Sequence, residues 1–127
     1  GKYKGIKQPS LNSRAGRHDI RMLETEFRKE SIEISRKIKD YSHKLNISPV
    51  QFSVAWVLAN RVITSVIAGP RNFEQWLEYY QALNIELGLK DESFVNSLVP
   101  SGHSSTYGFV DPRYPVKGRY LKEKNLL

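Results

Sequence analysis

The sequence lacks cysteine and any long hydrophobic run, and each absence excludes a class of protein. Without cysteine there are no disulfides, no thiolate metal site and no cysteine nucleophile. No apolar run approaches the roughly 18 residues that a membrane-spanning helix needs, and the opening residues do not resemble a signal peptide. We therefore expect a cytoplasmic protein that does not enter the membrane.

Histidine is also scarce, with three residues that have no metal-ligand spacing between them. His18, His43 and His103 lie far apart, and no carboxylate cluster accompanies them. We expect no metal site, and no nucleophile in the chain has the sequence context of a catalytic triad.

What is present fits a globular protein, with 39% hydrophobic and 26% charged residues in 127. The formal net charge is +7, and such an excess favours anionic partners. In the first forty residues, however, acidic side chains interrupt the basic ones, namely Asp19, Glu24, Glu26, Glu30, Glu33 and Asp40. This mixture is more typical of a solvated helix face than of a nucleic-acid surface.

The first half of the chain predicts a loop and two helices. Residues 1–23 show no sustained period and indicate a loop, whereas residues 24–45 have the apolar spacing of an amphipathic helix. Its predicted inward stripe consists of Phe27, Ile34, Ile38, Tyr41 and Leu45. A second helix is expected over 48–60, because Ser48 and Gln51 form a capping box around Pro49. Apolar residues cover most of its circumference, so it should be buried on several sides.

Residues 62–67 (VITSVI) form a short β-branched run without alternation, which predicts a strand buried on both faces as in a parallel sheet. A single strand of this kind needs partners on both edges. Its partners lie either in a missing N-terminal part or in another chain, and in the second case the exposed strand would produce oligomers.

The strand leads through a glycine turn directly into a third predicted helix. Asn72 is its expected N-cap, and the inward stripe is Phe73, Trp76, Leu77, Tyr80 and Leu83. Gly88 closes this helix, and Asp91 is expected to cap a short fourth helix over 94–99. Residues 100–127 predict an irregular tail.

The segment 64–75 (TSVIAGPRNFEQ) is the most informative part of the sequence. A strand that ends in a glycine turn and a helix N-terminus brings free amides and the positive end of the helix dipole together, which favours phosphate. Arg71 adds a charged fork suited to phosphate, and Gln75 lies one turn into the helix. By spacing alone, an ordinary turn with a surface arginine is an equal alternative.

Residues 48–58 (SPVQFSVAWVL), 64–71 (TSVIAGPR) and 74–75 (EQ) closely resemble the aldo-keto reductase family. There the same order forms the seventh helix, eighth strand and eighth helix of a (β/α)8 TIM barrel. Residues 1–3 are similar to the end of the loop after the seventh strand. The tail, with residues 102–105, 111–112, 114–116 and 118–119, is similar to one bacterial-type branch of the family.

The resemblance implies an oxidoreductase that transfers hydride between NADP(H), with NAD(H) as the alternative, and a small carbonyl substrate. It places Gly69, Pro70, Arg71 and Gln75 in the motif that holds the adenosine 2′-phosphate, with Glu74 beside the adenine. Tyr79 stands where relatives often have an adenine-binding asparagine, which leaves ring stacking as an alternative for that contact.

A complete barrel typically needs about 250 residues, and nothing in this sequence matches the family's catalytic tetrad of Asp, Tyr, Lys and His. We therefore expect a single C-terminal segment that is mostly helical with one strand and inactive alone. Residues 1–23 would be the loop after strand seven, 24–99 the helices and strand eight, and 100–127 the tail that shapes the substrate entrance. The alternative is a small basic helical module that binds nucleic acid or another partner.

Overall fold

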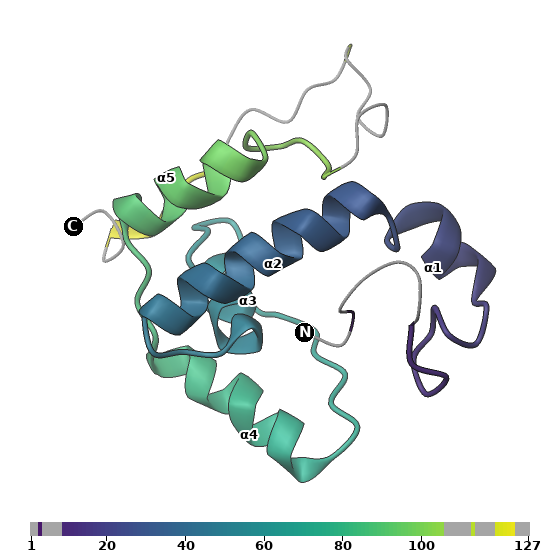
Figure 1. Cartoon of the computed structure of the whole chain (residues 1–127). Coiled ribbons are helices and arrows are strands. Elements are labelled where there is room, and N and C mark those ends of the chain that lie inside the picture. Colours follow the sequence, from purple (N-terminus) through teal and green to yellow (C-terminus); the bar gives the residue numbers. More distant parts are fainter. Residues whose placement is uncertain (1–2, 4–8, 106–112, 114–118, 124–127) are drawn as a thin grey trace.

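The computed structural model describes residues 3, 9–105, 113 and 119–123. The described residues are mostly helical (Figure 1). In chain order the elements are α1 (Ile20–Thr25), α2 (Lys29–Lys44), α3 (Pro49–Leu58), α4 (Phe73–Gln81), the 3-10 helix η1 (Ala82–Asn84) and α5 (Leu89–Leu98). Among them, no helix has the length and apolar character needed to cross a membrane.

The prediction of a single helix over 24–45 is wrong, because the structure has two helices there, α1 and α2, with a short turn between them. The Asp19 carboxylate accepts a hydrogen bond from the Met22 amide at 2.8 Å, so a helix begins earlier than predicted. It ends where the amides of Glu26 and Phe27 both bond to the Met22 carbonyl. Phe27 then turns inward, where it packs with a small buried cluster that contains Met22 and Ile32.

The second helix begins as predicted. Ser48 Oγ accepts from the Gln51 amide at 3.1 Å, and Gln51 Oε1 accepts from the Ser48 amide at 2.8 Å. This reciprocal cap starts α3 at Pro49. Neighbours lie on more than one side of α3, namely α2, α4 and η1. Phe52 and Ala55 are buried, and the other apolar positions of α3 are half-buried.

The main core lies where α2, α3 and α5 meet. Tyr41 of α2 stacks on Phe94 of α5 with ring centres 3.8 Å apart and meets the edge of Phe52. Its hydroxyl donates to the Asp91 carboxylate at 2.9 Å. Asp91 also accepts from the Gly88 amide, so α5 begins at Leu89, earlier than the predicted cap at Asp91.

Residues 62–67 do not form the predicted strand, and they are not buried. Val62 is 67% exposed and Ile67 fully exposed. A strand needs a neighbour for its amides and carbonyls, and among the described residues no second strand is available. In Figure 1 this teal segment runs from α3 to α4 as an open loop.

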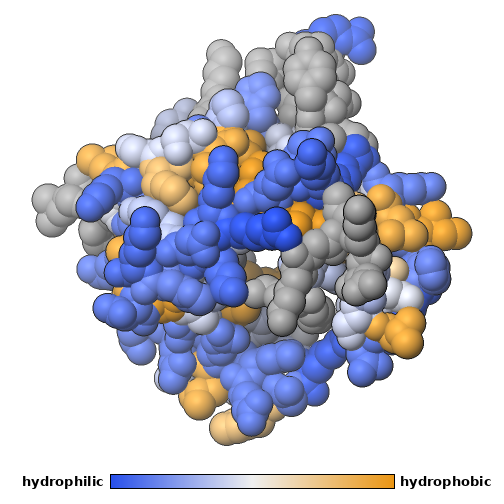
Figure 2. All heavy atoms as spheres, viewed as in Figure 1, coloured by the Kyte–Doolittle hydropathy of each residue, from blue (hydrophilic) through white to orange (hydrophobic). Residues whose placement is uncertain are grey.

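The predicted apolar stripe of α4 also faces outward, contrary to the expectation that it packs inward. Its members are all exposed, namely Phe73, Trp76, Leu77, Tyr80 and Leu83. Figure 2 shows apolar side chains that reach the surface in separate patches among the charged ones. α4 begins at the predicted N-cap but ends at Gln81, before the predicted close at Gly88. Its local signals were sufficient to start the helix, whereas the described residues leave its apolar stripe exposed.

The described part of the tail, residues 119–123, contacts α3 and α5. Leu121 forms an isolated antiparallel bridge with Asn60, the Tyr120 carbonyl accepts from the Arg61 amide, and the Lys122 amide donates to the Ala59 carbonyl. These contacts lie at the start of the 62–67 segment, at the far end from Gly69. Most of the tail that we predicted to shape a substrate entrance lies outside the described residues.

Candidate functional site

The predicted anion site lies at the start of α4, and its cap is confirmed. Asn72 Oδ1 accepts from the Gln75 amide at 2.9 Å, and the Trp76 amide donates to the Asn72 carbonyl at 3.2 Å. An asparagine is well suited to this position because its side-chain oxygen satisfies one of the free amides at a helix start.

A second side chain closes the turn from the other direction. Gln75 Oε1 accepts from the Arg71 backbone amide at 2.9 Å. This bond uses the acceptor of the Gln75 side chain, so its NH2 group is left as a donor. The structure thus brings together two predicted site residues, Arg71 and Gln75.

Donors remain available at this helix end. Within the described ranges, the amides of Phe73 and Glu74 have no acceptor, and no carboxylate pairs with the exposed Arg71 side chain. Free amides and the positive end of the helix dipole attract negative charge. Glu74 lies on the exposed first turn of α4, where its own carboxylate reduces this attraction.

Gly69 and Pro70 come just before this helix end in the chain. A side chain built at Gly69 would meet nothing within 4 Å, so the space around this residue is open. Pro70 is half-buried and Gly69 exposed. Both residues therefore leave the face in front of Arg71 accessible.

Tyr79 lies two turns into α4 and borders a hollow of about 510 Å³. Gly69 and Ala68 line the same hollow, opposite side chains of α2 and α3 such as Ile38 and Val54. The hollow is mainly apolar with a lysine at its side, Lys39. An aromatic ring at its border can stack on a flat ligand.

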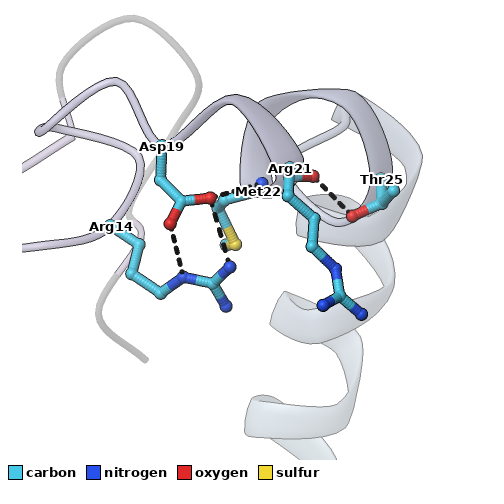
Figure 3. Close-up of polar contacts among 5 residues, drawn as sticks. All are labelled: Arg14, Asp19, Arg21, Met22 and Thr25. Atoms are coloured by element: carbon cyan, nitrogen blue, oxygen red, sulfur yellow. Dashed lines mark hydrogen bonds and ion pairs between the residues drawn. The ribbon is translucent and has the colours of Figure 1, made fainter.

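Some basic residues elsewhere are paired with acidic ones, among them Arg14 and Lys29. In Figure 3, Arg14 and Asp19 face each other, and two bonds of 3.2 Å join the guanidinium to the carboxylate. The hydrogen bond from Arg14, followed by that from the Met22 amide, lowers the pKa of Asp19. Lys29 similarly lies 3.9 Å from Glu33. These pairs reduce the positive field along α1 and α2 that a nucleic-acid surface would need.

One cluster of contacts could not be predicted from the sequence, because its members are far apart in the chain. The Arg119 side chain donates to Glu92 Oε1 at 2.8 Å and to the Trp56 carbonyl at 2.6 Å, and its guanidinium lies over the Trp56 ring. No local spacing signals such a contact. It holds the tail on α3 and α5 and lies away from the start of α4.

No group of three histidine, cysteine or acidic residues suited to a metal occurs in the part of the chain that the structure describes. The candidate site is therefore built from amides, one guanidinium and one aromatic ring. Such a set offers donors for an anion and a ring face for a flat group, the two features that a nucleotide combines.

Comparison with known proteins relates the chain to an oxidoreductase. It is 33% identical over 70 residues to an uncharacterized oxidoreductase, YrpG, of Bacillus subtilis (strain 168). The match covers 55% of this chain and 22% of that protein, so the chain spans about a fifth of its relative. No protein-family profile matches the chain, and no solved structure matches it.

Proposed function

We propose that this chain is the cofactor-binding C-terminal part of an NADP-dependent aldo-keto reductase. The complete enzyme would reduce aldehydes or ketones, or oxidise alcohols, by hydride transfer. The observation that carries the proposal is the junction from Gly69 to Arg71 into the capped start of α4, in a chain related to an oxidoreductase.

The residues present fit the adenosine end of the cofactor. Arg71 would pair with the 2′-phosphate, and the amides of Phe73 and Glu74 would donate to its oxygens. The free NH2 group of Gln75 would add a further donor on the same helix end. These donors favour a doubly charged phosphate monoester over a neutral ribose hydroxyl, and hence NADP(H) over NAD(H).

The adenine would lie toward Tyr79. The hollow that this ring borders opens beside Gly69, so a base whose ribose phosphate sits at Arg71 can reach it. Glu74, which is exposed in the first turn of α4, would accept from an amino group of the base.

The catalytic groups would come from outside this chain. We place the chain as the last part of a (β/α)8 barrel, in which residues 62–67 form the eighth strand and active sites lie at the carboxyl ends of the strands. The bound nicotinamide would supply or accept the hydride. Alone, the chain should show no reductase activity toward a small carbonyl substrate.

The proposal is tested in the complete enzyme with Arg71→Ala. Loss of a charge-assisted contact should raise the KM for NADPH by about tenfold to a hundredfold, while the KM for NADH stays within about twofold. Arg17→Ala, which removes another exposed arginine, serves as the control and should change neither constant. Equal losses for both cofactors in Arg71→Ala would contradict a role at the 2′-phosphate.

A further inference from the structure

A separate hollow of about 500 Å³ lies between α5 and the described part of the tail, and we call it the tail hollow. Polar and charged side chains make up most of its lining, namely Arg61, Glu92, Asn96, Ser101 and Arg119. It shares no lining residue with the hollow that Tyr79 borders. Sites for small molecules have volumes of about 300–1,000 Å³, so the tail hollow is large enough for a ligand.

Two residues of this lining carry a buried polar atom without a hydrogen-bond partner among the described residues. These atoms are Oδ1 of Asn96 and Oγ of Ser101. A buried oxygen without a partner costs stability, and such atoms are rare in folded proteins. An amide oxygen only accepts, whereas a serine hydroxyl accepts or donates. Hydroxyl groups of a ligand can therefore pair with both atoms and remove this cost.

The charges at the tail hollow leave one arginine without an acidic partner. Glu92 is already paired with Arg119 at 2.8 Å. Arg61 is exposed, and its guanidinium carbon lies 5.3 Å from the centre of the Tyr120 ring. Within the described ranges no carboxylate pairs with Arg61. A guanidinium fork beside an otherwise neutralised wall favours an anionic group.

We propose that the tail hollow is a binding site for a small anion that carries hydroxyl groups, such as a polyol phosphate or a hydroxycarboxylate. Arg61 pairs with the anionic group, while Asn96 and Ser101 hydrogen-bond with the hydroxyls. The site is distinct from the start of α4, because Arg61 precedes residues 62–67 in the chain and Gly69 follows them. It does not depend on the proposed function.

A ligand in the tail hollow would also hold the tail in place. It would contact α5 on one side and residues 119–121 on the other, next to the bond from the Lys122 amide to the Ala59 carbonyl. A ligand that binds only the closed form stabilises that form in proportion to its concentration above Kd. At ten times Kd, hydrogen exchange of the Lys122 amide should therefore slow by about tenfold.

The test is an NMR titration of this chain with glycerol 3-phosphate and, separately, with glycerate. The amides of Asn96, Ser101 and Leu121 should shift with at least one of them, and the compound that binds more tightly identifies the anionic group. Inorganic phosphate, acetate and glycerol each carry only one of the two kinds of group. Each should bind at least about tenfold more weakly.

Two variants separate binding from folding. Arg61→Gln removes the charge and should weaken binding by about tenfold or more, whereas Arg17→Gln at another exposed position should leave the affinity unchanged. Asn96→Leu should weaken binding by about fivefold. Without ligand, however, the Asn96→Leu chain should be at least as stable as the parent, because leucine leaves no unpaired oxygen and suits the interior of α5.

An absence of shifts at the tail hollow with both compounds would overturn the inference, as would unchanged affinity in Arg61→Gln or Asn96→Leu. Inorganic phosphate or acetate that binds as tightly as the larger compounds would indicate an adventitious ion only and overturn it too. Shifts confined to Arg71, Phe73 and Glu74 would place the binding at the start of α4 and contradict a second site.

Discussion

The guanidinium carbon of Arg119 lies 3.5 Å from the centre of the Trp56 ring, although 63 residues separate them. The same guanidinium pairs with Glu92 of α5, and the two side chains are only 9% and 12% exposed. One arginine thus joins the tail, α3 and α5 through an ion pair, a backbone hydrogen bond and a cation–π contact.

Arg119→Ala should therefore destabilise the chain by about 3 kcal/mol, because it leaves the Glu92 carboxylate buried without its partner. The free energy of unfolding in urea measures this loss. Adding Glu92→Gln to Arg119→Ala should recover part of it, since the amide carries no charge. Arg17→Ala, at an exposed position, should change the free energy by less than about 0.5 kcal/mol. If Arg119→Ala also lowered the free energy of unfolding by less than about 0.5 kcal/mol, the contact would not hold the tail.

Asp19 should make the N-terminal region sensitive to acid. The hydrogen bond from Arg14, and then that from the Met22 amide, lowers the pKa of Asp19 below its ordinary 3.8. The stabilisation is therefore complete above pH 3.8 and is lost as the pH falls through the lower, folded-state pKa. Carboxyl NMR shifts measure the titration directly. Arg14→Gln should raise the pKa of Asp19 toward 3.8, and an unchanged pKa would contradict the pairing.

Tyr41 should lose its proton only in strong alkali. Burial, and then the hydrogen bond to Asp91, raises the pKa of Tyr41 from 10.0 to about 12. The folded chain thus holds this proton more tightly than the unfolded one, so stability is complete below pH 10 and falls as the pH rises toward 12. Absorbance at tyrosinate wavelengths should show a late component that Tyr41→Phe removes. If the late component persists in Tyr41→Phe, another tyrosine is responsible.

Local signals in the sequence predicted helix starts well. Ser48 and Asn72 cap helices as expected, because a cap depends on residues within one turn of each other. Asp19 has the same chemistry, but the apolar period after it is too short to indicate a helix. The Met22 carbonyl then ends α1 by accepting two amides, a competition that apolar spacing does not reveal.

Packing was predicted less well than local structure. The stripe that begins at Phe73 and the predicted strand that ends at Ile67 have the composition of buried elements. The stripe is nevertheless exposed, and residues 62–67 form a loop that is not buried. Composition indicates that a residue is suited to burial, but burial itself requires a partner. The Arg119 contact shows the opposite case, in which a charged residue of an irregular tail is buried by distant elements.

The most direct test of the central claim is an NMR titration of this chain with adenosine 2′,5′-bisphosphate and, separately, with adenosine 5′-monophosphate. If the start of α4 holds a 2′-phosphate, the amides of Arg71, Phe73 and Glu74 should shift with the bisphosphate. They should shift little with the monophosphate, and Arg71→Ala should abolish the difference. Equal shifts with both nucleotides, or shifts confined to other parts of the chain, would contradict the account.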